Sequence, residues 1–402
     1  MKKYLCMCIS CAFVFFAKAQ EERLRDYVNP FVGTDGYGNI YPGSQIPFGG
    51  IQISPDTDNH FYDAASGYKY SHPTIMGFSL SHLSGTGIPD LGDFLFVPGT
   101  GEIKSIPGTH ENPDEGYRSR YSHEKEWASP GYYGVELIDY GVKAEMTSAC
   151  RSGIFRFTYP ASDKAFILVD LNHTLWQSCP WSNLRQLNDS TIVGYKLVKG
   201  WGPERHIYFA ATFSRKLEHF YILQDGKPVI YNTKRFRSHK EAWGEKLMAC
   251  FTFSTHTGEE VYVKTAISGV STEGALANIN ELDGLTFESV KSRAEELWEK
   301  ELGKYHVAGD LKTKRTFYTS AYHAALHPFV FQDADGRYRE LDKNIGRAEG
   351  FTNYTTFSLW DTYRAFHPLL NLVNQPLQAN IANSMLAHYD KSVEEMLPLW
   401  SF

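Results

Sequence analysis

Residues 286–304 read TFESVKSRAEELWEKELGK, and this stretch separates two kinds of sequence. Its apolar residues recur at intervals of three and four positions: Phe287, Val290, Ala294 and Leu297. Charged residues fill most positions between them. Because an α-helix turns once every 3.6 residues, this spacing places the apolar side chains on one face. The stretch predicts an amphipathic helix, and we take residues 285–308 as a linker helix between two domains.

Upstream of this helix the sequence is dominated by short runs of β type. Eight runs alternate polar and apolar residues or are rich in β-branched and aromatic residues: 94–97, 132–138, 154–159, 166–171, 192–198, 207–213, 248–253 and 261–267. Runs this short and closely spaced are typical of antiparallel sandwiches. We therefore expect a large antiparallel β-sandwich over residues 20–284.

The part of this domain before the runs is different in character. Residues 26–90 are rich in Gly, Pro, Asp, Asn, Ser and Tyr and show little helical periodicity. Such a composition predicts long loops between short strands. Binding sites are commonly built on loops of this kind.

Downstream of residue 308 the pattern is helical. Residues 313–326, 357–373 and 378–397 each predict a helix. Between the first two, residues 329–341 alternate around Asp335-Gly336, a dipeptide that favours a hairpin turn. Residues 309–402 are long enough for about three or four helices. We therefore expect the beginning of an all-α domain that is incomplete within this sequence.

Charge and composition limit the function classes. The chain has 402 residues, of which 40 are Lys or Arg and 46 are Asp or Glu, for a formal net charge of −6. Neither sign forms a long block, which argues against a nucleic-acid partner. Aromatic residues make up 15% of the chain. That share suits a protein that stacks rings on sugars, and it suits a large aromatic core equally well.

The N-terminus predicts export. Residues 1–19 carry Lys2 and Lys3, an apolar run over 4–16, and the small-residue pattern Ala17-Lys18-Ala19. This order is typical of a cleaved secretory signal peptide. The run is shorter than the roughly 20 residues that span a bilayer, so we expect no membrane span.

Three cysteines follow the expected cleavage site, namely Cys150, Cys179 and Cys250. One disulfide with one free thiol fits an oxidising compartment, and three unpaired cysteines fit equally well. Their spacing does not suggest a zinc site.

Clusters of polar and aromatic residues stand out in the loop region and again near the C-terminus. The loop clusters are VNPFVGT (28–34), YPG (41–43), PFG (47–49), SPDT (54–57), SGY (66–68), GFS (77–79), GTG (85–87), Asp90 and Gly92-Asp93. The later cluster is YTTFSLWDTYR (354–364).

The later cluster has a spacing that suits a sugar site. Asp361 and Arg364 lie three residues apart, so in a helix they share a face next to Trp360. A carboxylate and a guanidinium can grip adjacent hydroxyls while a ring covers an apolar sugar face. A surface ion pair beside a core tryptophan gives the same spacing. For the glycine-rich loops, turn chemistry is the corresponding alternative.

Taken together and in this order, the clusters resemble glycoside hydrolase family 92, the secreted, calcium-dependent exo-α-mannosidases of glycan-degrading bacteria. The resemblance runs from about residue 26 to the end of the sequence. It implies a β-sandwich packed on an (α/α)6 toroid, of which this chain holds the first helices, with the active site in the cleft between them. It also implies secretion to the periplasm or cell surface of a bacterium.

The resemblance implies a chemistry as well. In inverting hydrolysis, one carboxylic acid protonates the departing glycosidic oxygen and a second carboxylate activates water on the opposite face. A Ca²⁺ ion is expected to hold hydroxyls of the mannose, as suits a hard cation with oxygen ligands. The expected partner is a mannose-containing oligosaccharide from an N-glycan or mannan.

Residue by residue, the resemblance assigns substrate contacts only. Asp361 matches the aspartate that binds the mannose, with Trp360 supporting its placement and Arg364 orienting it. The segment with Gly85, Thr86, Gly87 and Asp90 is expected to be the contribution of the sandwich to the cleft.

The sequence departs from the family at two cleft positions. Tyr62 stands where many members specific for the α-1,2 linkage have a Trp, and Ile88 stands where the family has a Cys. Preference for the α-1,2 linkage is therefore left open.

The sequence contains no acidic residue that matches the general acid or general base of the family, and its metal ligands are unknown. The resemblance places these residues in later helices of the toroid. We therefore expect a truncated α-mannosidase that does not turn over mannosides alone, unless a second chain supplies the rest of the toroid. Two alternatives are a mannose-binding fragment without catalysis and a gene fragment that does not fold stably.

Overall fold

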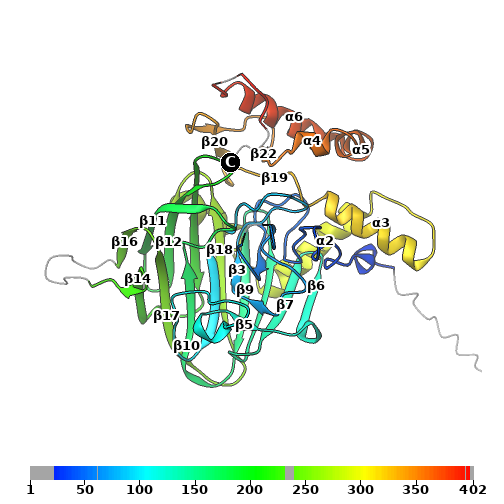
Figure 1. The fold of residues 1–402 in the computed structure, drawn as a ribbon. Coiled ribbons are helices and arrows are strands. Elements are labelled where there is room, and N and C mark those ends of the chain that lie inside the picture. Colours follow the sequence, from blue (N-terminus) through cyan, green and yellow to red (C-terminus); the bar gives the residue numbers. More distant parts are fainter. Residues whose placement is uncertain (1–21, 61, 231–239, 394, 399–402) are drawn as a thin grey trace, which may run out of the picture.

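The computed structural model describes residues 22–60, 62–230, 240–393 and 395–398. Its larger part consists of two antiparallel β-sheets, and a set of helices follows (Figure 1). The expected signal peptide lies outside the described residues.

The larger sheet has nine strands in the order β16-β11-β12-β13-β18-β9-β8-β7-β6. Their bounds are β6 (Glu126–Ser129), β7 (Tyr132–Leu137), β8 (Val142–Ser148), β9 (Ser152–Tyr159), β11 (Ser178–Gln186), β12 (Thr191–Lys199), β13 (Arg205–Phe213), β16 (Glu241–Gly244) and β18 (Glu259–Ser268). Neighbouring strands pair antiparallel throughout, as in β8 and β9, where Met146 lies opposite Phe155.

The smaller sheet has seven strands in the order β1-β3-β4-β10-β17-β14-β15. Their bounds are β1 (Ser54–Asp56), β3 (Gly77–Ser79), β4 (Leu95–Thr100), β10 (Ser162–Asp170), β14 (His219–Gln224), β15 (Lys227–Pro228) and β17 (Leu247–Thr255). A two-stranded pair, β2 (Thr74–Ile75) and β5 (Ser119–Arg120), lies outside both sheets.

The two sheets share one hydrophobic core. Phe96 of β4 and Phe155 of β9 place their ring centroids 5.0 Å apart, and the ring of Phe94 lies 4.4 Å from that of Phe209 on β13. Contacts of this kind join inward-facing residues of both sheets into a single buried cluster. The expected antiparallel β-sandwich is confirmed.

All eight β runs noted in the sequence are strands, but several strands were not expected. β11 is the clearest case, because it contains Pro180 and the exposed Trp181 and so reads as a loop. It forms because β12 and β16 pair with it on both sides. Pairing with these two neighbouring strands therefore makes residues 178–186 a strand, although their own sequence does not predict one.

Helix α1 (Thr272–Ile279) was not expected either, and it covers part of the outer face of the larger sheet. Ala275 and Ile279 pack there against Val193, Ala210 and Ala266. A short 3-10 turn (Asn280–Leu282) follows it. The strands of the two large sheets end at residue 268, and α1 begins four residues later.

Helix α2 (Phe287–Leu302) confirms the helix expected over residues 286–304. Thr286 caps it, since its side chain accepts a hydrogen bond from the backbone N–H of Ser289. The apolar face differs at one position: Leu297 is 42% exposed, and Trp298 is fully buried instead. Trp298 lies inward because its indole N–H donates to the carbonyl of Gln45, at 2.7 Å.

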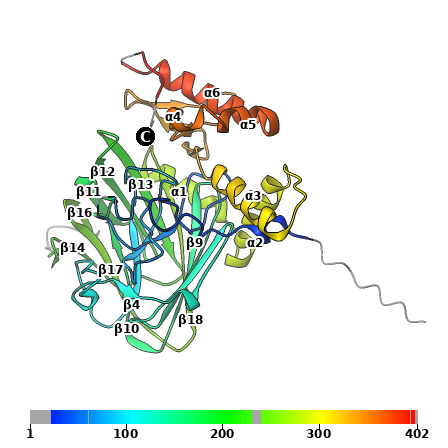
Figure 2. The ribbon, with the colours of Figure 1, turned by 45° about the vertical axis from the view of Figure 1, so that its right-hand side comes forward.

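The later helices lie over one end of the sandwich, while α2 and α3 (Leu311–Ala324) lie along its side (Figures 1 and 2). The other helices are α4 (Leu359–Thr362), α5 (Phe366–Val373) and α6 (Gln375–Tyr389). Short strand pairs separate α3 from α4: β19 (Phe329–Val330) with β22 (Tyr354–Thr355), and β20 (Arg337–Arg339) with β21 (Ile345–Arg347).

Three local expectations for this region need correction. The helix expected over 357–373 is broken between α4 and α5, where Ala365 leaves the helical conformation. The helix expected to reach residue 397 ends at Tyr389. Of the hairpin expected over 329–341, the turn at Asp335-Gly336 forms, with the backbone N–H of Asp333 donating to the carbonyl of Arg337 at 2.8 Å, but Phe329 and Val330 pair with β22 instead.

Hydrogen bonds fasten the helical region to the sandwich. The Asp333 carboxylate accepts from the Ser268 hydroxyl at 2.8 Å and from the Asn278 amide at 2.9 Å. The backbone N–H of Phe48 donates to the carbonyl of Ala325, and that of Val330 donates to the carbonyl of Phe48. These contacts place the loops of the sandwich directly against the start of the helices.

The structure also bears on the expected disulfide and on the expected absence of a membrane span. Cys150, Cys179 and Cys250 are all free, so the disulfide alternative does not occur. Among the described residues, no helix combines the length and the apolar composition needed to cross a bilayer.

A buried histidine on α6 is expected to make the helical region sensitive to acid. His388 on α6 is buried, and within the described chain neither ring nitrogen has a hydrogen-bond partner. Burial lowers the pKa of His388 to about 4. An unfolded histidine titrates near 6.5, so the stability that the neutral ring contributes is present above pH 6.5 and is lost as the pH falls towards 4.

We therefore expect the thermal unfolding midpoint to fall steadily between pH 6.5 and pH 4. The variant His388→Phe should lose less stability over this range, with a difference of up to about 3 kcal/mol at pH 4. His256→Phe, which replaces an exposed histidine, is the control. Identical pH profiles for wild type and His388→Phe would contradict this expectation.

Candidate functional site

The residues expected to contact substrate lie in two parts of the structure. Tyr62, residues 85–87 and Asp90 belong to loops of the sandwich between β1 and β4. Trp360 and Asp361 lie on α4, and Arg364 follows it.

Asn39 holds the glycine-rich loop of the sandwich in place. Its side-chain amide donates to the carbonyl of Thr86 at 2.7 Å, and its own carbonyl accepts from the N–H of Gly85 at 2.7 Å. The hydroxyl of Ser66 donates to the same Asn39 carbonyl. The loop and the SGY cluster are thereby both tied to Asn39, which lies two residues before the YPG cluster.

The glycines of this loop face open space. Gly85 has a positive φ of 70°, a conformation that favours glycine, whereas Gly87 does not. A Cβ atom added at either position would meet nothing within 4 Å in the described chain. Packing within this chain therefore does not explain the glycine at 87, and the loop surface is free to approach another group.

Asp90 is placed differently from its loop neighbours. Its side chain is buried, with one oxygen accepting from the N–H of Leu91 at 2.7 Å and the other from the N–H of Trp201 at 3.1 Å. Burial raises the pKa of the Asp90 carboxyl above its ordinary value, although Arg205 opposes this. In this structure Asp90 anchors the loop of Trp201.

Trp201 was not singled out from the sequence, although it is 49% exposed and its backbone N–H donates to Asp90, three residues after the glycine-rich loop. Gln177 secures a second neighbouring loop, since its amide donates to the carbonyl of Pro89. An exposed tryptophan near a candidate loop could have marked Trp201 as a site residue, but its exposure is known only from the structure.

Asp93 forms a buried charge cluster beneath these loops. Its carboxylate contacts Lys196 Nζ at 3.0 Å and Arg205 Nη1 at 2.5 Å, and it accepts from the Ser81 hydroxyl at 2.6 Å. The Asp93 side chain has no exposed surface. Burial raises the pKa of this carboxyl, but Arg205 and Lys196 outweigh it and hold the pKa below its usual range.

A small cavity lies above Asp93, between the sandwich and β19. Arg205, Ser268, Phe329 and Asp333 are among its lining residues. Its volume is about 40 Å³, whereas a single water requires about 10–15 Å³ by the same kind of measure. It is sized for a few waters and is too small for a sugar ring.

A second buried carboxylate organises the SPDT and SGY clusters. Asp56 contacts His82 Nε2 at 2.7 Å and His173 Nε2 at 2.8 Å. Burial raises the pKa of the Asp56 carboxyl, but His82 and His173 outweigh this and lower it overall. Gly67 lies against this group, because a Cβ added there would lie 2.0 Å from Asp56 Oδ1.

Gly67→Ala is therefore expected to destabilise the sandwich by about 2–4 kcal/mol, since it combines a positive φ with a buried clash. Gly85→Ala is the matched control, because Gly85 also has a positive φ but open surroundings. It should cost about 1–2 kcal/mol. Denaturant unfolding measures both losses of stability. Equal losses for the two variants would show that the clash with Asp56 adds nothing to the cost of Gly67→Ala.

The later cluster presents Asp361 and Trp360 at the surface. Ser358 takes a left-handed conformation with φ of 44° just before α4, and its hydroxyl donates to Asp361 Oδ2 at 2.7 Å. The side chain of Trp360 is 53% exposed. A fixed carboxylate thus lies beside a half-exposed aromatic ring.

Arg364 does not share a helical face with Asp361, because α4 ends at Thr362. Its guanidinium donates to the Tyr363 hydroxyl at 3.4 Å and lies 5.9 Å from the centre of that ring. The orienting role expected for Arg364 stays a prediction.

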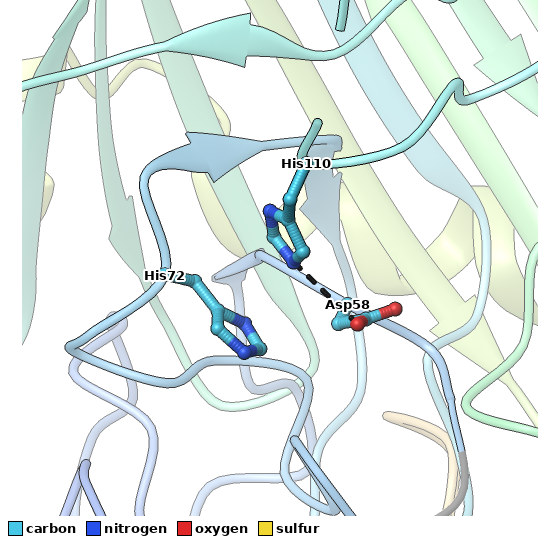
Figure 3. A group of neighbouring side chains, drawn as sticks. All are labelled: Asp58, His72 and His110. Carbon is cyan, nitrogen blue, oxygen red and sulfur yellow. Dashed lines mark ion pairs between the residues drawn. The ribbon is translucent and has the colours of Figure 1, made fainter. Parts of the chain in front are cut away.

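Calcium prefers oxygen ligands. Within the described ranges, one group of three or more His, Cys, Asp and Glu side chains is close enough to share a metal ion, namely Asp58, His72 and His110 (Figure 3). Two of its three members offer imidazole nitrogen, so this group does not fit calcium. We derive no catalytic step through calcium from it.

Comparison with known proteins identifies the family. The model of the glycosyl hydrolase family 92 N-terminal domain matches residues 27–268, and the model of the family 92 catalytic domain matches residues 274–402. A curated relative from Arthroderma benhamiae, described as an uncharacterized secreted glycosidase, is 25% identical over 327 residues, which are 75% of this chain and 41% of that protein.

Two solved structures are similar over nearly the whole chain. A family GH92 α-mannosidase from Bacteroides thetaiotaomicron, solved in complex with mannoimidazole, is 76% identical with a TM-score of 0.93, covering 95% of this chain and 50% of that one. The GH92 glycosyl hydrolase ccman5 is 25% identical with a TM-score of 0.80, covering 91% and 49%.

This chain spans about half the length of these solved relatives. The boundary between the two family models falls where the last sandwich strand gives way to α1. Because the two models together match nearly all of the described residues, the chain belongs to glycosyl hydrolase family 92.

Proposed function

We propose that the protein containing this sequence is a secreted α-mannosidase that removes α-linked mannose from glycans with inversion at the anomeric carbon. The observation that carries the proposal is the 76% identity, over 95% of this chain, to an α-mannosidase of Bacteroides thetaiotaomicron. Secretion to the periplasm or cell surface is supported by the apolar N-terminal run and by a relative described as secreted.

In this proposal Asp361 and Trp360 bind the terminal mannose. Ser358 fixes the Asp361 carboxylate through Oδ2, so Oδ1 is available to accept hydrogen bonds from sugar hydroxyls. The half-exposed ring of Trp360 offers a flat apolar surface next to it. An apolar ring beside a charged acceptor suits a sugar, which has both an apolar face and a rim of hydroxyls.

The glycine-rich loop and Tyr62 are proposed to line the cleft from the sandwich side. Gly85 and Gly87 leave their surface open, and Tyr62 is 48% exposed. Asp90 contributes indirectly in this view, because it anchors the loop of Trp201. A tyrosine at position 62 offers a smaller ring and a hydroxyl where a tryptophan would offer a larger one, so linkage preference is expected to depend on it.

The proton transfers require two further carboxyl groups. In inverting enzymes they lie about 6.5–9.5 Å apart to leave room for the attacking water. We propose that this pair, the calcium ligands and the remaining helices of an (α/α)6 toroid belong to the part of the family that this chain does not cover. The 402 residues alone are then expected to bind mannosides without hydrolysing them.

The test is mannose release from α-linked mannobiose in the presence of calcium. The longest natural form of the protein should release mannose, and failure on every α-mannoside tried would contradict the proposal. The 402-residue chain alone should release none, while calorimetry should still detect mannoside binding. Clear turnover by this chain would place the general acid and base within it.

A further inference from the structure

The group of Asp58, His72 and His110 draws its members from three separate loops. Asp58 follows β1, His72 precedes β2, and His110 lies between β4 and β5. One ligand atom from each residue lies within 4.8 Å of the others (Figure 3). The fold therefore brings together side chains separated by up to 52 positions in the sequence.

Each histidine has one ring nitrogen engaged away from the centre of the group. His110 Nδ1 lies 2.8 Å from Thr74 Oγ1 and accepts from Arg118 at 3.0 Å. His72 Nε2 lies 3.0 Å from a carboxylate oxygen of Asp63, and His72 Nδ1 lies 3.0 Å from Thr57 Oγ1. Histidines that bind metals typically have their second nitrogen held in this manner by a neighbouring oxygen, which fixes the ring orientation.

The second ring nitrogen of His110, Nε2, has no hydrogen-bond partner within the described chain. Within the described chain, Nε2 is buried without a hydrogen bond, and it lies 3.5 Å from Asp58 Oδ2. That separation exceeds the 2.7–3.2 Å of ordinary N–H···O bonds. Two ligand atoms on a tetrahedral zinc, each about 2.0–2.2 Å from the metal, lie about 3.3–3.5 Å apart. The spacing thus fits two ligands of one metal better than a hydrogen bond.

The donor set indicates which metal. Two imidazoles and one carboxylate suit Zn²⁺ and the neighbouring first-row divalent ions, whereas Ca²⁺ and Mg²⁺ prefer oxygen. The group also lies within the sandwich loops, remote in sequence from Asp361.

We propose that Asp58, His72 and His110 bind one divalent transition-metal ion of the zinc class. Asp58 Oδ2, His110 Nε2 and His72 Nδ1 are the ligand atoms, and His72 Nδ1 exchanges its contact with Thr57 Oγ1 for the metal. Binding at Nε2 places the ring proton of His110 on Nδ1, which then donates to Thr74 Oγ1. Arg118 Nη1 gives up its hydrogen bond to Nδ1 and keeps those to Thr74 Oγ1 and to the carbonyl of Thr57. The positive charge of Arg118 beside this ring opposes a second cation, so we expect an exchangeable metal and not a permanently bound one.

The site would brace the loop that carries Tyr62. Asp58 lies at the start of this loop and Asp63 follows Tyr62, while His72 and His110 belong to neighbouring segments. A metal ion that binds the folded chain raises its melting temperature with increasing metal concentration, because it favours the folded state by mass action.

The experiment is titration of the chelator-treated 402-residue chain with Zn²⁺ by calorimetry and thermal melting. We expect one site per chain, a rise in melting temperature, and the strong visible absorption of tetrahedral Co²⁺ when Co²⁺ replaces zinc. Ca²⁺ should not compete. His110→Gln should abolish these effects. His256→Gln is the matched control, because His256 Nε2 also lies 3.5 Å from a carboxylate oxygen, that of Glu259, but at the surface.

Absence of stoichiometric zinc binding by the wild type would overturn the proposal, and so would unchanged binding by His110→Gln. If His110→Gln does not fold, Asp63→Asn replaces it. That variant leaves the three ligands intact and is expected to weaken zinc affinity about 10–100-fold. Unchanged affinity would contradict the proposal. These readouts involve no sugar, so they are independent of mannosidase activity.

Discussion

Replacing Asp93 with alanine is expected to lower the free energy of unfolding by about 5 kcal/mol, at the upper end of what loss of a buried ion-pair partner costs. Asp93 is the shared anion of Lys196 and Arg205, and all three side chains are almost completely buried. Without it, Lys196 and Arg205 stay in the core without the anion that they share. Denaturant unfolding monitored by circular dichroism measures the loss.

Two further variants test whether the loss comes from the buried charge cluster. Asp163→Ala, which removes an exposed aspartate from β10, should change the unfolding free energy by no more than about 0.5 kcal/mol. Lys196→Met in the Asp93→Ala background should recover part of the loss, because it removes one of the unpaired charges. An Asp93→Ala variant as stable as Asp163→Ala would show that the charge cluster does not stabilise the fold.

Replacing Asp361 with alanine is expected to reduce kcat/KM of the proposed α-mannosidase by about 100-fold or more. Hydrogen bonds to a charged group each contribute about 1.5–3 kcal/mol, and the carboxylate is proposed to hold two hydroxyls of the mannose. In the 402-residue chain alone, the same change should abolish the heat of mannoside binding.

Asp342→Ala serves as the control for Asp361→Ala. Asp342 is also an exposed aspartate of the helical region, and its carboxylate contacts its own neighbour Asn344. This variant should keep wild-type kinetics and binding. Full activity of Asp361→Ala would remove Asp361 from the substrate site and leave the family assignment untouched.

The sequence predicted an element well where the residues that form it lie close together in the chain. Helix α2 was expected because its apolar spacing lies within one stretch, and the residue that caps it, Thr286, lies in the same stretch. Even there, the sequence pointed to Leu297 on the buried face, whereas Trp298 occupies it. The carbonyl that Trp298 reaches belongs to Gln45, which is 253 positions away.

Sequence reasoning failed where distant residues decide the conformation. The hairpin over 329–341 was expected from alternation and from turn chemistry at Asp335-Gly336, and of this hairpin only the turn forms. In the structure Asp333 is held by Ser268 and Asn278, 65 and 55 positions earlier, and Phe329 and Val330 pair with β22. These contacts leave the first expected strand without its expected partner.

For the candidate site as well, the sequence indicated which residues to consider, and the structure decided which of them are exposed. The order of the motifs pointed to Asp361, Trp360 and the glycine-rich loop, and the structure leaves all of these at the surface. Asp90 and Asp93 lie in the same motifs, yet both are buried and hold neighbouring loops or charges. Residue type alone does not separate an exposed carboxylate from a buried one.

The sequence by itself determined the family, the order of a β-sandwich before helices, and the choice of the cluster around Asp361 as a candidate site, because these rest on local periodicity and on short motifs in a fixed order. Only the tertiary structure decided which acids are buried, where the helices break, and that Asp58, His72 and His110 meet. The physical reason is that burial, pairing and metal-ligand distances depend on residues far apart in the chain, and these come together only when it folds.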